Sequence, residues 1–174
     1  FLDRVDIISS LGYTVLISNY QKYYTLVSYL SDSVRNRKVG VILGVDNLKQ
    51  IFENKYYDTL KGQLLEAYGR LFGRNVKVYV YPALGEEEGA MRTLDNIELE
   101  SDDLYHLINY LKQVEKIEDI QCSNRDILHI FSDQVVQMIK DNDEGWEFMV
   151  PSIVAKRIKE NQLFGCKPEL VENI

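Results

Sequence analysis

Val39-Gly-Val-Ile-Leu-Gly44 decides the fold, together with two apolar stretches of the same kind on either side of it. These are Tyr13-Thr-Val-Leu-Ile-Ser18 and Val76-Lys-Val-Tyr-Val-Tyr-Pro82. Each is short, apolar and followed by a break in the pattern, which indicates a strand. The segments between them have helical spacing, so the pattern predicts a mostly parallel sheet covered by helices. We therefore expect an α/β fold, three-layered and Rossmann-like, with a helical C-terminal extension.

The pattern divides the chain into three parts. Residues 1–84 hold the three strands and their helices and form the expected sheet core, whose third strand alternates in polarity as an edge strand does. Residues 85–100 contain three consecutive glutamates, Glu86–Glu88, and show no periodicity, which predicts an exposed acidic loop. Residues 101–174 carry helical apolar stripes and are expected to form an extension packed on the core within one domain.

Local signals place the ends of several helices. Gly12 follows a short amphipathic helix over residues 3–11, and Asp46 is expected to cap a helix that carries Leu48, Ile51 and Phe52. Ser123 with Asp126 resembles a capping box. A helix that leads straight into a strand is the second half of a βαβ unit. We therefore expect a further strand before Phe1, in a longer protein.

Charge and composition favour some classes of binding partner over others. The 174 residues carry a net charge of −7, but the first 84 hold 11 basic and 7 acidic residues, and the rest hold 9 and 20. The acidic half argues against nucleic-acid binding, whereas the mildly basic half can accept a small phosphorylated ligand. No apolar run is long enough to span a bilayer and no signal segment opens the chain, so we expect a cytoplasmic protein without a membrane partner.

Catalytic and metal-binding patterns are not found in the sequence. The two histidines, His106 and His129, lie outside the predicted sheet, and no Gly-x-Ser-x-Gly elbow is present. Cys122 and Cys166 have no metal-ligand spacing and are expected to be free thiols. We therefore assign no catalytic residue and no metal site, and we leave the cofactor open.

The candidate ligand site lies where the strands end. Parallel sheets bind ligands beyond the carboxyl ends of their strands, and a helix N-terminus there can hold an anion. No Lys-Ser/Thr pair follows Gly44, so a P-loop is excluded, and an ordinary turn with Ser18 or Asn19 as a helix cap is the alternative. The candidate ligand-binding residues are Ser18, Asn19, Tyr20, Gly44, Asp46, Asn47 and Tyr81.

Several stretches resemble a known family. Residues 1–20, which begin Phe1-Leu-Asp-Arg-Val, residues 64–72 (Leu64-Leu-Glu-Ala-Tyr-Gly-Arg-Leu-Phe72), residues 126–132 and Gly145-Trp-Glu-Phe-Met-Val-Pro151 resemble the C-terminal region of a family of large bacterial proteins. Its members are labelled nicotinate-nucleotide adenylyltransferase or TonB-dependent receptor. The chain lacks the His-x-x-His pair of the first and the alternating strands of the second, so no catalytic residue is carried over. The resemblance implies a cytosolic part of a longer protein.

Three functions remain open. The first is a binding or regulatory module for a nucleotide-like or other phosphorylated small molecule. The second is part of an enzyme, nucleotidyltransferase-like, completed by an N-terminal region. The third is an assembly domain, whose twelve tyrosines suit a half-buried interface with a second copy or with N-terminal domains of the same protein.

Overall fold

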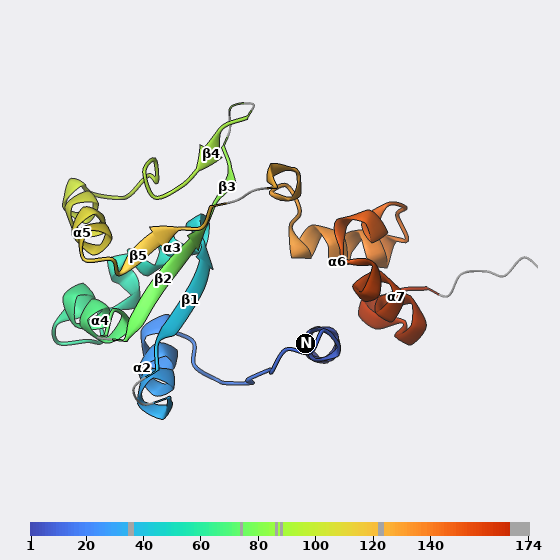
Figure 1. The fold of residues 1–174 in the computed structure, drawn as a ribbon, viewed down its shortest axis with the longest axis horizontal. Helices are drawn as coiled ribbons and strands as arrows, with labels where there is room; N and C mark the ends of the chain where they lie inside the picture. Colours follow the sequence, from blue (N-terminus) through green and yellow to red (C-terminus); the bar gives the residue numbers. More distant parts are fainter. Residues whose placement is uncertain (35–36, 74, 86, 88, 122–123, 168–174) are drawn as a thin grey trace, which may run out of the picture. The chain divides into compact units, whose positions relative to one another are not determined.

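The computed structural model describes residues 1–34, 37–73, 75–85, 87, 89–121 and 124–167. The chain divides into two compact units (Figure 1). The α/β unit is Asn19–Arg125, and the helical unit combines Phe1–Ser18 with Asp126–Ile174. The division therefore falls at other places than the predicted boundaries, because the last strand of the sheet lies within residues 101–174.

A parallel sheet of three strands forms the centre of the α/β unit. β1 (Val39–Gly44), β2 (Val76–Tyr81) and β5 (Ile117–Asp119) lie in the order β1-β2-β5, and both pairs are parallel (Figure 1). The α/β fold with a parallel sheet is thus confirmed. The prediction that residues 76–82 form an edge strand is wrong, because β2 has a neighbour on each side.

Helices connect the strands on one face of the sheet. α2 (Tyr23–Ser33) precedes β1, α3 (Val45–Ile51), the short turn η1 (Asn54–Tyr56) and α4 (Gln63–Leu71) link β1 to β2, and α5 (Asp102–Gln113) leads to β5. Crossovers between parallel strands are right-handed, so an order that steps in one direction places successive connecting helices on the same face. All four helices contribute to one apolar cluster, as this rule requires.

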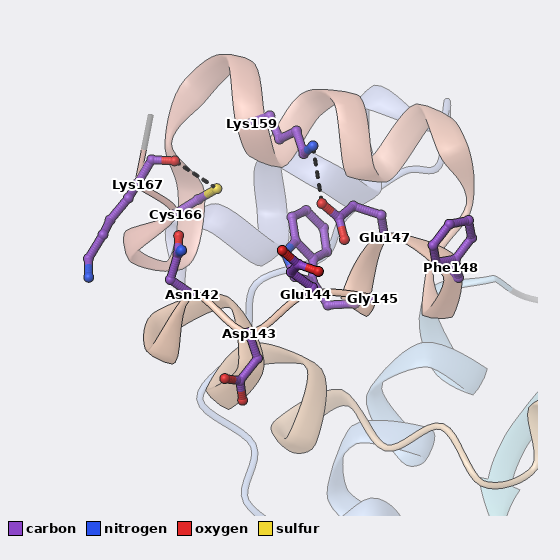
Figure 2. A pocket seen from close by; sticks show the side chains of 10 residues that line it. Asn142, Asp143, Glu144, Gly145, Glu147, Phe148, Lys159, Cys166 and Lys167 are labelled. Atoms are coloured by element: carbon purple, nitrogen blue, oxygen red, sulfur yellow. Dashed lines mark hydrogen bonds and ion pairs between the residues drawn. The ribbon is translucent and has the colours of Figure 1, made fainter. Parts of the chain in front are cut away.

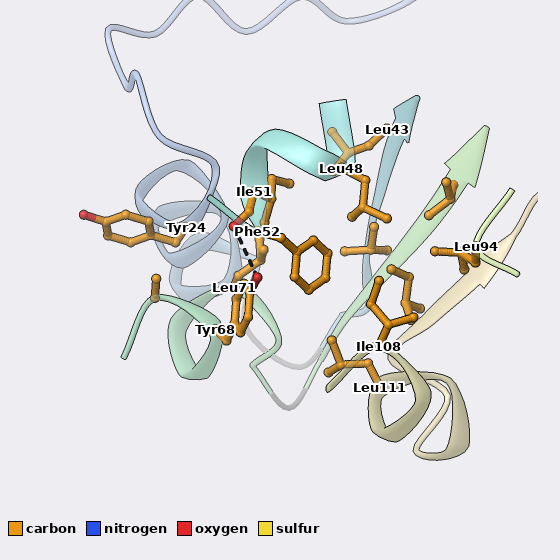
Figure 3. Close-up of a cluster of buried hydrophobic side chains, with 14 of the residues drawn as sticks. Tyr24, Leu43, Leu48, Ile51, Phe52, Tyr68, Leu71, Leu94, Ile108 and Leu111 are labelled. Atoms are coloured by element: carbon orange, nitrogen blue, oxygen red, sulfur yellow. Dashed lines mark hydrogen bonds between the residues drawn. The ribbon is translucent and has the colours of Figure 1, made fainter. Parts of the chain in front are cut away.

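The core lies between this face and the helices (Figure 3). Val76, Val78 and Val80 point into it and are at most 2% exposed. The helix predicted around Leu48 and Phe52 packs there with both side chains buried.

The opposite face of the sheet is uncovered in the described part of the α/β unit. Ile42 lies on this face and is 69% exposed, with Lys77 and Tyr79 of β2 beside it. Here the unit has two layers, and the predicted third layer is not seen.

The segment 83–100 is more ordered than predicted. β3 (Ala83–Leu84) and β4 (Met91–Arg92) form a small antiparallel hairpin. Leu94 and Ile97 follow it and are buried in the core. Of the acidic triplet, Glu87 is exposed, while Glu86 and Glu88 lie outside the described residues.

The prediction that residues 13–18 form a strand is wrong. These residues form neither helix nor strand, and Tyr13, Leu16 and Ile17 are more than half exposed. Apolar, β-branched composition favours an extended chain, but a strand also needs a neighbour that satisfies its backbone groups.

The helical unit contains α1 (Leu2–Ser10), α6 (Ser132–Asp141) and α7 (Ser152–Asn161), with the short turns η2 (Arg125–Ile127, at the boundary), η3 (Trp146–Met149) and η4 (Leu163–Gly165). The helix over residues 3–11 is confirmed, and Gly12 follows it with a φ of +85°. The helix expected after the capping box of Ser123 and Asp126 begins instead at Ser132. Ser123 itself and Cys122 lie outside the described residues. Among the described residues, no helix combines the length and the apolar character needed to cross a membrane.

Candidate functional site

At the carboxyl end of the sheet, the structure brings together four of the predicted residues. Gly44 and Tyr81 are neighbours in the register of β1 and β2, and Asp46 and Asn47 lie in the first turn of α3. Gly44 is the N-cap and no side chain caps the helix, so the prediction that Asp46 is the cap is wrong.

Asp46 instead forms an ion pair with Arg92. The two terminal guanidinium nitrogens of Arg92 donate to the Asp46 carboxylate at 2.6 and 3.0 Å, and its Nε donates to the Leu84 carbonyl at 3.1 Å. A bidentate contact of this kind fixes the relative orientation of the two side chains and also adds charge attraction. Arg92 therefore ties the hairpin to the start of α3, and this polar pair has a structural role.

Asp119, at the end of β5, has a similar role. Its Oδ1 accepts a hydrogen bond from the Leu94 N–H at 3.0 Å. Burial raises the pKa of this carboxyl, and the Leu94 bond opposes that shift. The segment after β4 is thus hydrogen-bonded to the end of β5, at the carboxyl edge of the sheet.

Within the described sheet, the strand order differs from the order that usually forms a ligand crevice at this edge. Such crevices form where strand order reverses and adjacent connections leave in opposite directions. The order β1-β2-β5 does not reverse within the described sheet.

The predicted residues before α2 are divided between the two units. Ser18 belongs to the helical unit, Asn19 and Tyr20 to the α/β unit, and all three are exposed. The Tyr20 ring contacts that of Tyr29, with centroids 5.6 Å apart. The N-cap of α2 is Lys22, so the alternative prediction of Ser18 or Asn19 as a helix cap is also wrong.

A cavity of about 410 Å³ lies at the opposite, amino end of the sheet. We call it the lysine cavity, because each of the three strands supplies a lysine near its start. Lys38 directly precedes β1, Lys77 is the second residue of β2 and Lys116 directly precedes β5. Asn75, Tyr79 and Glu115 also line it. Three cations against one carboxylate make its lining positive.

The three lysines differ in how they are held. Lys116 Nζ donates to the carbonyl oxygens of Gly73 at 2.6 Å and Val76 at 3.4 Å, which fixes its position. Lys77 Nζ lies 2.7 Å from a Glu118 carboxylate oxygen, and this hydrogen bond raises the pKa of Lys77. Lys38 is exposed and has no hydrogen bond or ion pair with the described residues. Lys38 is therefore the cation most available to a ligand.

Sequence reasoning missed this cavity for a definite reason. Lys38 and Lys77 are visible beside predicted strands, but Lys116 adjoins β5, which the pattern did not predict. The convergence of the three lysines depends on strand order, which local pattern does not contain.

A second cavity, of about 580 Å³, lies in the helical unit around the turn between α6 and α7 (Figure 2). Lys159 Nζ lies 3.1 Å from a carboxylate oxygen of Glu147. The pKa of Glu147 is lowered, mainly by a backbone N–H that donates to the carboxylate and further by Lys159. Cys166 donates weakly from Sγ to the Lys167 carbonyl at 3.7 Å. The described residues contain no group of three or more His, Cys, Asp or Glu that could hold a metal ion, so the acidic side chains here do not form a metal site.

Comparison with known proteins does not assign the site. No family model, curated protein or solved structure matches the chain. The resemblance to large bacterial proteins therefore stays a prediction.

Proposed function

We propose that the chain is a binding module for an anionic, phosphorylated small molecule, and that the lysine cavity is its site. The observation that carries the proposal is the convergence of Lys38, Lys77 and Lys116 on one cavity from three adjacent strands. This keeps the predicted ligand class and moves the site to the other end of the strands.

Size and rigidity support this proposal. A volume of about 410 Å³ lies within the range of about 300–1,000 Å³ typical of small-molecule pockets. Lys77 and Lys116 are held by bonds to Glu118 and to backbone carbonyls, so they need little ordering when a ligand binds. Lys38 can then complete the contact to a phosphate as a charge-assisted donor.

Calorimetric titration with inorganic pyrophosphate and ribose 5-phosphate at low ionic strength tests the site. Lys38→Ala should weaken binding about tenfold or more, since a hydrogen bond to a charged group contributes about 1.5–3 kcal/mol. Lys61→Ala is the matched control, because Lys61 is equally exposed in the same unit and does not line the cavity. Absence of binding, or equal losses in the two variants, would contradict the proposal.

Self-assembly is a second candidate function, favoured by the exposed face and free edge of β1. The Val39 N–H donates to the Asn75 carbonyl at 2.8 Å, on the side of β1 that pairs with β2. Because backbone groups alternate in direction along a strand, those of Gly40 and Ile42 point toward the other edge of β1. The same edge of a second copy could pair with it and continue the sheet. Light scattering over a range of concentrations tests this, and a strict monomer at high concentration excludes it.

The three-layer, Rossmann-like form of the fold also stays a proposal. Parallel sheets are usually covered on both faces, and the exposure of Ile42 supports a further layer at this position. An enzyme completed by an N-terminal region stays a prediction, tested by activity that appears only when that region is present.

A further inference from the structure

We infer that the ligand of the lysine cavity is a nucleoside phosphate, whose base stacks on Tyr79 while its phosphate contacts Lys38 and Lys77. This inference rests on the proposed function, and it names the ligand class of the same site.

Tyr79 is placed as an aromatic platform. It alternates with the buried Val78 and Val80 on β2, so its half-buried side chain lies on the uncovered face of the sheet. It also lines the cavity that holds the three lysines. An aromatic ring beside a positive groove is the combination with which proteins bind nucleotide bases and their phosphates together.

Gly40 fixes where this ring lies. A Cβ at position 40 would come within 3.2 Å of Tyr79 Cε2, closer than ordinary contact, so the ring packs directly against the β1 backbone. A platform held this way loses little freedom when a base stacks on it.

Lys77 connects the platform to the anion site. Its Nζ lies over the Tyr79 ring, 5.6 Å from the ring centroid, and 2.7 Å from a Glu118 carboxylate oxygen. A base that stacks on Tyr79 therefore lies next to Lys77 and beside the other lysines that line the cavity. Asn75 adds a polar group to the same lining. Its amide nitrogen donates to the Arg37 carbonyl at 2.8 Å, and among the described residues its amide oxygen has no hydrogen-bond donor.

The test compares ligands that share a phosphate and differ in the base. We would titrate the protein with ribose 5-phosphate and with AMP, GMP, CMP and UMP, following backbone amide shifts by NMR. At least one nucleotide should bind about tenfold more tightly than ribose 5-phosphate, because base–aromatic stacking adds to the shared phosphate contact. Tyr79→Ala should remove that advantage, whereas Tyr79→Phe should keep it.

The outcomes separate the inference from the function on which it rests. If ribose 5-phosphate binds through Lys38 and no nucleotide binds better, the nucleoside inference is overturned and the proposed function stands. If neither ribose 5-phosphate nor any nucleotide binds, both fall. Gly40→Ala provides an independent check, since displacing the ring should lower nucleotide preference without replacing any lysine.

Discussion

Ile42 and Leu43 are adjacent on β1, and their side chains lie on opposite faces of the sheet. Leu43 is 5% exposed in the core, whereas Ile42 is 69% exposed. Replacing Leu43 with threonine loses about 1.5–3 kcal/mol of apolar burial and buries a hydroxyl at a further cost of about 1–3 kcal/mol. The same change at Ile42 keeps a β-branched residue and exposes the hydroxyl to water. Because only about a third of Ile42 is covered, its cost should stay below about 1 kcal/mol.

Urea unfolding at low protein concentration measures both costs. The single tryptophan, Trp146, lies in the helical unit, so its fluorescence follows the unfolding of that unit. The transition seen by far-UV circular dichroism but not by Trp146 fluorescence belongs to the α/β unit. If Ile42→Thr lowers the free energy of unfolding as much as Leu43→Thr does, the face is covered and the two-layer description is refuted.

Three further results are expected. A double-mutant cycle on Asp46 and Arg92 should give a coupling of about 0.5–1 kcal/mol, because both side chains are partly exposed. Burial raises the pKa of Asp119 in the folded state, so the free energy of unfolding should fall as pH rises above about 4 and this carboxyl ionises. Asp119→Asn should flatten this fall in unfolding measurements between pH 4 and 7. Tyr57→Phe removes the 2.6 Å hydrogen bond to the Ile51 carbonyl and should lower the thermal midpoint by an amount equivalent to about 1 kcal/mol.

The elements that the sequence predicts best are those with strong periodicity. The helix carrying Leu48 and Phe52 and the strand around Val78 repeat their apolar residues at the spacing of one buried face, and both are confirmed. β5 is only three residues long and exists because it pairs with residues of β2 that lie 39 positions earlier in the chain. Residues 13–18 show the converse, since their local preference for a strand is not met by a partner.

The candidate site was harder to predict than the fold. Residues at the ends of strands can be read from sequence, but what fills that space cannot. Arg92, which lies 46 residues after Asp46 in the sequence, pairs with Asp46 in the predicted ligand site. The lysine cavity in turn depends on which strands are neighbours. Local pattern therefore locates chemical groups along the chain without showing which of them meet.

The helical unit is built from both ends of this chain. The Phe164 N–H donates to Asp3 at 2.7 Å, and Arg4 lies 3.1 Å from Asp133. Residues 19–125 form a compact unit between these two parts. During synthesis, which proceeds from the N-terminus, the α/β unit can fold once Arg125 has emerged from the ribosome. α1 must wait for α6 and α7, so its apolar side chains stay without these packing partners until both later helices have been made.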